Sequence, residues 1–173
     1  MGTGKSAVGE RLARSLGWDF VDADPVVEQD MGMPVTEIFS RLGEAAFRRA
    51  EERVVLRLLR EAAASARGTV VSLGGGAVTI PAVAEKLKAE PRVFLLDEDV
   101  DTAFQRACRQ PRPLAAGAER FRALFAEREE LYRSVAGFII DTRGKGVEQV
   151  AGEIEDLMRG NNTEMNDGRK GTP

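Results

Sequence analysis

Short apolar strands alternate with helical patterns along most of this 173-residue chain, and this alternation limits the folds available to it. Runs rich in β-branched and aromatic residues predict strands at 19–24, 69–73, 92–96 and 138–141. Apolar residues at helical spacing predict helices between them, at 5–16, 25–32, 34–42, 44–65, 100–107, 118–134 and 147–159, with another starting at Pro81. Consecutive strands joined through helices predict an α/β fold, with a parallel sheet covered by helices on both faces.

One domain is expected over residues 1–160, because the composition is even and no repeat or linker interrupts it. The last thirteen residues, 161–173, are polar and rich in turn formers, which predicts a disordered tail. Residues 108–117 contain two prolines and are expected to form a loop.

The composition excludes several classes of function. The chain has no histidine and one cysteine, which excludes a serine–histidine triad and a disulfide framework. A net charge of −3 does not provide the basic surface that duplex nucleic acid requires. No apolar run reaches the roughly 20 residues that span a bilayer, and no signal peptide is recognisable. We therefore expect a cytoplasmic protein that binds neither nucleic acid nor membranes. We also expect it to be a monomer.

The segment MGTGKS, residues 1–6, contains the second half of a phosphate-binding loop and directly precedes a predicted helix. Glycines let backbone N–H groups turn toward phosphates, and a helix N-terminus adds positive potential. In such a loop Lys5 reaches the outer phosphates and the Ser6 hydroxyl binds Mg²⁺. The full motif has a further glycine upstream of Gly4, so a flexible start that contains these letters by chance is the alternative.

Two aspartates end the first predicted strand, where ligands bind in parallel sheets. One of Asp22 and Asp24 would hold a water molecule of Mg²⁺, and the other would accept a hydrogen bond from a substrate hydroxyl. The alternative is a solvated turn in which the second aspartate caps the helix opened by Pro25. The sequence alone leaves both interpretations open.

Three consecutive glycines, Gly74, Gly75 and Gly76, follow the strand at 69–73. Glycine favours neither helix nor strand, and it lets the backbone approach a ligand closely. An ordinary strand-to-helix turn needs only one or two such residues, so the run favours a binding site.

Arginines occur in three segments where they either bind an anion or lie on a solvated surface. Arg48 precedes Glu52 by four residues on a predicted helix, which is the spacing of a surface ion pair. An arginine that binds a substrate carboxylate would have the same sequence pattern. Arg112 lies in the loop 108–117, which suits a lid over phosphates and equally a solvated basic loop. Arg128 has acidic neighbours on a predicted helix, again with a salt-bridged surface as the alternative.

The order of the segments MGTGKS, VDAD, GMPVTEIF, FRRAEE, SLGGGAV, RPL and ER..LY closely resembles the shikimate kinase family. The resemblance covers about residues 1–160, and the triple glycine and the first arginine of FRR are its most discriminating parts. It implies a three-layer phosphate-binding-loop kinase with the strand order 2-3-1-4-5. The implied reaction is transfer of a phosphoryl group from ATP to the 3-hydroxyl of shikimate, with Mg²⁺, in the biosynthesis of chorismate and aromatic amino acids.

The resemblance also implies a role for each matching residue. Residues implied at ATP are Gly2, Thr3, Gly4, Lys5, Ser6, Ala7, Arg106, Arg112 and Lys145. Residues implied at shikimate are Asp24, Arg48, Gly74, Gly75, Gly76 and Arg128. Ser6 and Asp22 are implied at Mg²⁺, the aspartate through water. Lys5 and Arg112 would neutralise charge during transfer, while Asp24 would orient the hydroxyl or accept its proton.

The chain departs from the family pattern at its front, where family members have a hydrophobic central strand followed by a glycine. Without that strand, the strands at 69–73 and 92–96 would have unpaired edges in the middle of the sheet. We therefore expect the chain as written to fold poorly or to bind ATP weakly. We also expect the true start of the protein to lie roughly ten residues upstream of Met1.

Two other functions stay open at this point. One is another kinase of small hydroxy acids, such as a gluconate kinase, against which the triple glycine and the two arginines argue. The other is a truncated remnant without catalytic activity, which would show no ATP turnover even with the missing strand restored.

Overall fold

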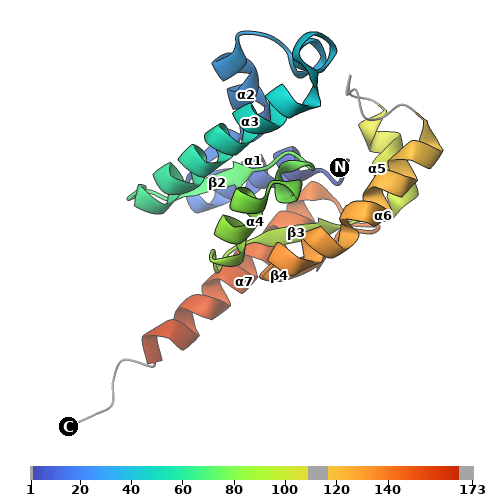
Figure 1. Cartoon of the computed structure of the whole chain (residues 1–173). Helices are drawn as coiled ribbons and strands as arrows, with labels where there is room; N and C mark the ends of the chain where they lie inside the picture. The colour runs from blue at the N-terminus through green and yellow to red at the C-terminus, as the bar shows by residue number, and fades with distance from the viewer. Residues whose placement is uncertain (1, 109–116, 168–173) are drawn as a thin grey trace.

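The structure, a computed structural model, describes residues 2–108 and 117–167, with the backbone alone for 161–167 (Figure 1). The helices are α1 (Lys5–Leu16), α2 (Ala23–Met31), α3 (Val35–Ala64), α4 (Pro81–Lys88), α5 (Val100–Ala107), α6 (Ala118–Val135) and α7 (Val147–Asp167), with a short 3₁₀ helix at Ala77–Thr79. The strands are β1 (Asp19–Asp22), β2 (Thr69–Ser72), β3 (Phe94–Asp97) and β4 (Phe138–Asp141). No helix among these residues has the length and apolar character needed to cross a membrane.

The strands form two parallel pairs. Strand β1 pairs with β2, with Asp19 opposite Thr69, and β3 pairs with β4, with Phe94 opposite Phe138. Within the described part of the chain, β2 and β3 have no strand between them, and each pairs on one side only. The predicted α/β fold and this grouping of strands are confirmed. Poor folding and weak ATP binding stay predictions.

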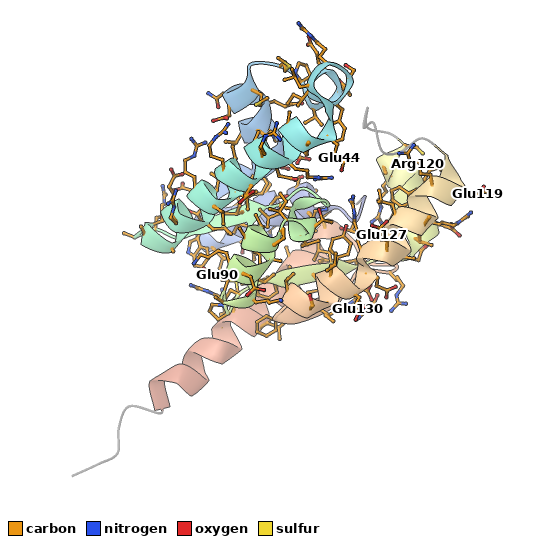
Figure 2. The ribbon with its side chains drawn as sticks, viewed as in Figure 1. Glu44, Glu90, Glu119, Arg120, Glu127 and Glu130 are labelled. Carbon is orange, nitrogen blue, oxygen red and sulfur yellow. The ribbon has the colours of Figure 1, made fainter. Side chains whose placement is uncertain are left out.

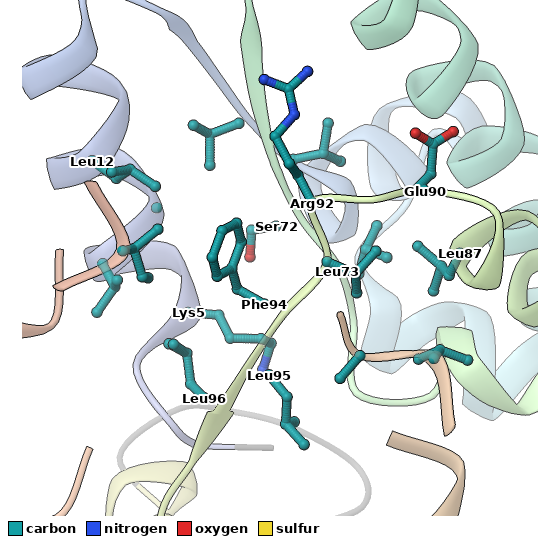
Figure 3. A pocket seen from close by; sticks show the side chains of 18 of the residues that line it. Lys5, Leu12, Ser72, Leu73, Leu87, Glu90, Arg92, Phe94, Leu95 and Leu96 are labelled. Atoms are coloured by element: carbon teal, nitrogen blue, oxygen red, sulfur yellow. The ribbon is translucent and has the colours of Figure 1, made fainter. Parts of the chain in front are cut away.

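A cavity of about 590 Å³ separates the two pairs of strands (Figure 3). Its walls are mainly apolar and include Leu12, Phe94 and Leu96. Lys5 and Gly74 also line it, so the cavity adjoins the segments that the sequence marks as ligand-binding. Apolar walls between two strand edges are typical of a sheet interior, and we therefore look for the ligand site at the ends of the strands.

Each pair of strands has its own apolar core. Helices α2 and α3 pack with β2 and α4 around Val27, Val54 and Val83. Helix α1 packs on β1 and β2 and against α7, and Leu12 and Ile154 of these two helices form a second core with β3 and β4. Figure 1 shows α2 and the first part of α3 on one side of the molecule and α5 with α6 on the other. Loops that begin at the strand ends can therefore bring residues from both sides to one site.

The prediction for the end of the first strand is partly wrong. Strand β1 ends at Asp22, and α2 begins at Ala23 rather than at Pro25. Asp22, with φ −96° and ψ 125°, is the N-cap, and its side chain accepts a hydrogen bond from the Asp24 backbone N–H. The cap is therefore the first aspartate and not the second, because only an extended residue leaves its side chain free to reach the first turn.

The break between the predicted helices 34–42 and 44–65 is confirmed, because α3 has non-helical angles at Gly43, where φ is 80°. The end of the last helix differs from prediction. Helix α7 does not end before Gly160 but continues to Asp167, so the first seven residues of the predicted tail 161–173 are helical. The residues that follow Gly160 are mostly Asn, Thr and Asp, which are weak helix formers, so helix propensity does not explain this extension. Residues 168–173 lie outside the described part.

Candidate active site

Two glycines shape the loop before α1. Gly2 has φ +67° and Gly4 has φ +86°, conformations that side chains rarely adopt. A Cβ on Gly2 would also lie 2.0 Å from the Ala103 carbonyl oxygen, so the loop packs tightly against α5. Thr3 between them is buried. Left-handed glycines before a helix turn backbone N–H groups toward one point, which is the geometry of an anion site.

The predicted metal ligands lie together beside this loop. Ser6, in the first turn of α1, donates a hydrogen bond from its hydroxyl to the Asp22 carboxylate. No group of three or more acidic, cysteine or histidine side chains that could hold a metal occurs in the described part of the chain. Mg²⁺ commonly needs only one or two protein oxygens when phosphates supply other ligands. The Ser6–Asp22 pair therefore fits Mg²⁺ bound together with a phosphorylated ligand.

The glycine run lies against three charged side chains. A Cβ on Gly74 would lie 2.6 Å from an Asp24 oxygen and 2.7 Å from a Glu51 oxygen. A Cβ on Gly76 would lie 2.0 Å from the Arg48 guanidinium. The absence of side chains at these positions is therefore what lets both carboxylates and the guanidinium approach the backbone.

The far wall of this pocket comes from α6. The Tyr132 hydroxyl donates a hydrogen bond of 2.6 Å to the Gly75 carbonyl oxygen, and Arg128 approaches the same oxygen at 3.4 Å. Arg128 is buried, with 4% of its surface exposed. Figure 2 shows Glu44 on α3 and Glu127 on α6, the two helices that contribute Arg48 and Arg128. The structure thus brings together all six residues that the sequence assigned to the acceptor: Asp24, Arg48, Gly74, Gly75, Gly76 and Arg128.

Charges of both signs are concentrated in the pocket. Arg48 pairs with the buried Glu51 at 2.5 Å and with Glu44 at 3.0 Å. Burial raises the pKa of Glu51 above the ordinary glutamate value near 4.5, although the neighbouring Arg48 opposes this shift. Burial likewise raises the pKa of Tyr132, so its hydroxyl stays protonated at neutral pH. Helical spacing suggested an ion pair between Arg48 and Glu52. In the structure Arg48 pairs with Glu51 instead, so the suggested Arg48–Glu52 pair is wrong.

The raised pKa of Glu51 makes stability depend on pH. The folded state binds a proton at Glu51 more readily than the unfolded chain, so this contribution to the free energy of unfolding is greatest below the ordinary pKa. It is lost as pH rises through the folded-state pKa. We expect the free energy of unfolding to fall more steeply between about pH 4 and pH 7 in the wild type than in Glu51→Gln. Urea unfolding over that range measures both slopes.

The matched control for this experiment is Glu61→Gln, on the exposed side of the same helix. Parallel curves for the wild type and Glu51→Gln would contradict the assignment of the raised pKa to Glu51.

Gly76 offers a test of how closely Arg48 must approach the backbone. Its φ of −96° and ψ of −13° suit any residue, so Gly76→Ala should not strain the chain. The new Cβ would instead displace the Arg48 guanidinium. We expect the KM for the acceptor to rise about tenfold while the KM for ATP changes little, as for loss of one charged hydrogen bond. Steady-state kinetics measure both values.

Gly152→Ala in α7 is the matched control, because a Cβ there meets no atom within 4 Å. Equal kinetics for Gly76→Ala and Gly152→Ala would mean that Arg48 does not need its observed position.

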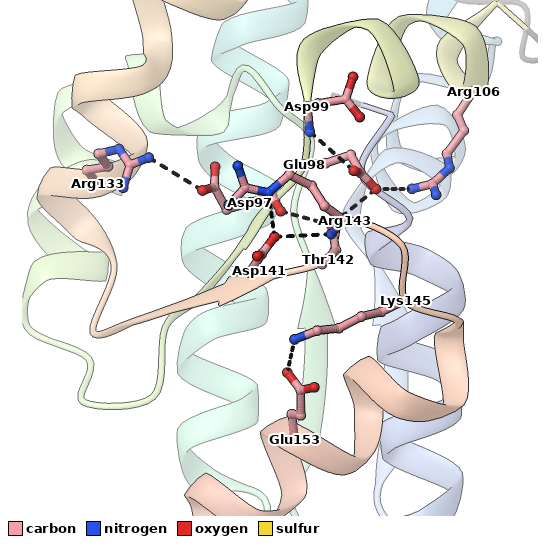
Figure 4. A network of polar contacts seen from close by, with 10 residues as sticks. All are labelled: Asp97, Glu98, Asp99, Arg106, Arg133, Asp141, Thr142, Arg143, Lys145 and Glu153. Carbon is pink, nitrogen blue, oxygen red and sulfur yellow. Dashed lines mark hydrogen bonds and ion pairs between the residues drawn. The ribbon is translucent and has the colours of Figure 1, made fainter.

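The residues expected on the nucleotide side are only partly placed there. Gly2, Thr3, Gly4, Lys5, Ser6 and Ala7 form the loop and the first turn of α1. Arg106 lies in the last turn of α5, paired with Glu98 at 2.7 Å (Figure 4). Lys145 is paired with Glu153 of α7 at 2.7 Å, so its ammonium group is directed along that helix. Arg112 and most of the loop 108–117 lie outside the described residues.

Glu51 and Tyr132 are pocket residues that the motifs did not identify. Glu51 lies three residues after Arg48, within the FRRAEE segment, and nothing in the sequence distinguishes it from the acidic residues around it. Tyr132 belongs to the ER..LY segment, but that resemblance implies no role for it. The one usable signal is helical spacing, since Tyr132 is four residues after Arg128 and therefore shares its face of α6.

An anion-binding glycine loop, a serine–aspartate pair and a charged pocket all lie at the carboxyl ends of parallel strands. This combination defines a phosphate-binding-loop kinase. The comparisons with known proteins narrow the class. The model of the shikimate kinase family matches residues 1–159, so the chain belongs to the shikimate kinase family.

Individual relatives agree with this assignment. A shikimate kinase from Mycobacterium avium is 45% identical over 144 residues, covering 82% of this chain and 79% of the relative. One from Moorella thermoacetica is 42% identical over 161 residues, covering 92% and 90%. Among solved structures, the shikimate kinase from Acinetobacter baumannii in complex with shikimate has a TM-score of 0.85 at 33% identity, covering 93% of this chain and 89% of that one.

Proposed function

We propose that this protein transfers the γ-phosphoryl group of ATP to the 3-hydroxyl of shikimate, giving shikimate 3-phosphate and ADP. The observation that carries the proposal is the meeting of Arg48 and Arg128 at the glycine run, beside the phosphate-binding loop. The likeness to a solved shikimate kinase that holds shikimate supports the same assignment. The reaction belongs to the biosynthesis of chorismate and aromatic amino acids.

The loop before α1 binds the phosphates of ATP. Its backbone N–H groups and the N-terminus of α1 attract the phosphate oxygens, and Lys5 neutralises charge on the outer ones. Phosphoryl transfer spreads negative charge over the equatorial oxygens, so positioned cations accelerate it without covalent catalysis. This chemistry therefore does not require histidine, which the chain lacks.

Ser6 and Asp22 would hold Mg²⁺ beside the loop. The contact between the two side chains supports this pairing. When bound, the cation neutralises charge on the phosphates. Asp22 also caps α2, which fixes the position of its carboxylate.

Arg48 and Arg128 bind the carboxylate of shikimate, for which a planar guanidinium is better suited than an ammonium group. Asp24 lies beside Gly74, where it orients the 3-hydroxyl or accepts its proton. Glu51 holds the Arg48 guanidinium in place through their ion pair. Roles for Arg106, Arg112 and Lys145 at ATP stay predictions, as do the monomeric state and the cytoplasmic location.

A panel of acceptors tests this function. The purified protein is incubated with ATP and Mg²⁺, and ADP release is followed with shikimate, methyl shikimate or gluconate as acceptor. We expect turnover with shikimate and strongly reduced turnover with its methyl ester, which lacks the charge that the arginines bind. Preference for gluconate would support a different small-acid kinase, and absence of ADP release with every acceptor would support a non-catalytic remnant.

A further inference from the structure

Glu98 is a buried carboxylate at the carboxyl end of β3, outside the pocket described above. Its side chain is 1% exposed. The carboxylate accepts hydrogen bonds from the Asp99 backbone N–H at 3.2 Å and from the Arg106 guanidinium at 2.7 Å. The Thr142 hydroxyl lies 3.2 Å from the same oxygen that Arg106 contacts. A buried carboxylate is stable only when it is paired and hydrogen-bonded in this way.

These contacts join three elements at one point (Figure 4). Asp99 caps the start of α5 by accepting from two backbone N–H groups, and Arg106 lies in the last turn of that helix. Thr142 directly follows β4, and its backbone N–H donates to the Asp97 carbonyl oxygen at 2.8 Å. Glu98 therefore fixes both the start and the end of α5 relative to the sheet.

Helix α5 is in direct contact with the phosphate-binding loop. Gly2 packs so closely on Ala103 that a Cβ on the glycine would overlap the Ala103 carbonyl oxygen. Arg106 follows Ala103 by three residues, about one helical turn. The Arg106 side chain is 43% exposed, so its guanidinium contacts Glu98 while part of it stays accessible. A cation held in this way lies near the loop that receives the nucleotide.

We propose that Glu98 is a positioning residue that holds the Arg106 guanidinium in the orientation that contacts the bound nucleotide. The proposal rests on the proposed function, since it assumes that ATP binds at the loop beside α5. Glu98 itself does not touch the nucleotide; it acts by removing rotational freedom from Arg106. Of the three acidic residues in sequence at 97–99, only Glu98 is buried, and its donors come from α5 with its N-cap and from the residue after β4.

A double-mutant cycle tests this role. Glu98→Gln keeps the shape of the side chain but removes its charge, while Arg106→Met removes the guanidinium. We expect each variant to raise the KM for ATP about tenfold, with the KM for shikimate unchanged within about twofold. The double variant should be no weaker for ATP than Arg106→Met alone, because Glu98 acts only through Arg106. The control is Asp141→Asn, which removes an exposed carboxylate at the end of β4.

Two outcomes would overturn the proposal. Multiplication of the two single effects in the double variant would mean that Glu98 acts independently of Arg106. An unchanged KM for ATP in Arg106→Met would also overturn the proposal. Because the Arg106 side chain is partly exposed, this variant can be measured even if Glu98→Gln does not fold. The dissociation constant of a fluorescent ATP analogue is measured in parallel without acceptor. Nucleotide binding thus remains measurable even if shikimate is not phosphorylated, so the two failures are distinguishable.

Discussion

Replacing Lys5 with alanine is expected to lower kcat by about 100- to 1,000-fold, the loss that typically follows removal of one group that stabilises developing charge. Lys5 opens α1 directly after Gly4, which places a side-chain cation beside the loop proposed to bind the phosphates. The charge on the transferred group is shared between its oxygens at the transition state, and no neighbouring residue in the first turn of α1 supplies a replacement cation. Initial rates at saturating ATP and shikimate measure the effect.

Lys88→Ala is the matched control for this experiment, because Lys88 lies at the end of α4 in an exposed pair with Glu85. The control should keep wild-type kcat. Retention of activity within about threefold in Lys5→Ala would contradict the role of the loop in phosphoryl transfer.

The second large effect is expected for Arg48→Ala. This change removes a guanidinium that is mostly buried and leaves the carboxylate of Glu51 without its ion pair. Removing one partner of a buried, charged hydrogen bond generally costs about 2–5 kcal/mol, which corresponds to at least a 30-fold loss in kcat/KM for shikimate at roughly the lower limit. The KM for ATP should change far less, because Arg48 lies on the acceptor side of the glycine run.

Arg49→Ala separates this effect from a general loss of charge on α3. Arg49 is the adjacent residue and is exposed, so its removal should leave both KM values near those of the wild type. If Arg48→Ala weakened ATP and shikimate to the same degree, the assignment of the α3 arginine to the acceptor would be wrong. Thermal unfolding of both variants shows whether the chain keeps its fold.

Residues that belong to continuous motifs were predictable from the sequence. The glycine loop, the Gly74–Gly76 run and the aspartates at the junction of β1 and α2 each lie next to a recognisable strand or helix. Their place at the sheet edge therefore follows from topology. The assignment of Arg48 and Arg128 to the acceptor pocket rested on resemblance to a family. Local sequence does not distinguish an arginine that binds a ligand from a surface arginine on a helix.

The burial of Glu51 and Glu98 was not predictable from the sequence. Glu51 and Glu98 have acidic neighbours in sequence, and only burial and contacts from other elements distinguish them. The extension of α7 past Gly160 was also not predictable. A glycine followed by polar residues usually marks the end of a helix, but here the helix continues. The Asp22 cap was missed for a related reason: strand and helix meet at that residue, and spacing alone does not locate the boundary.

The most direct test of the central claim is identification of the product formed from ATP and shikimate. Phosphorus–proton correlation NMR of the reaction mixture shows which carbon bears the new phosphate ester. We predict one phosphate monoester at the 3-position of shikimate for each ADP released. Release of ADP without a phosphorylated shikimate, or an ester at another hydroxyl, would contradict the proposed function.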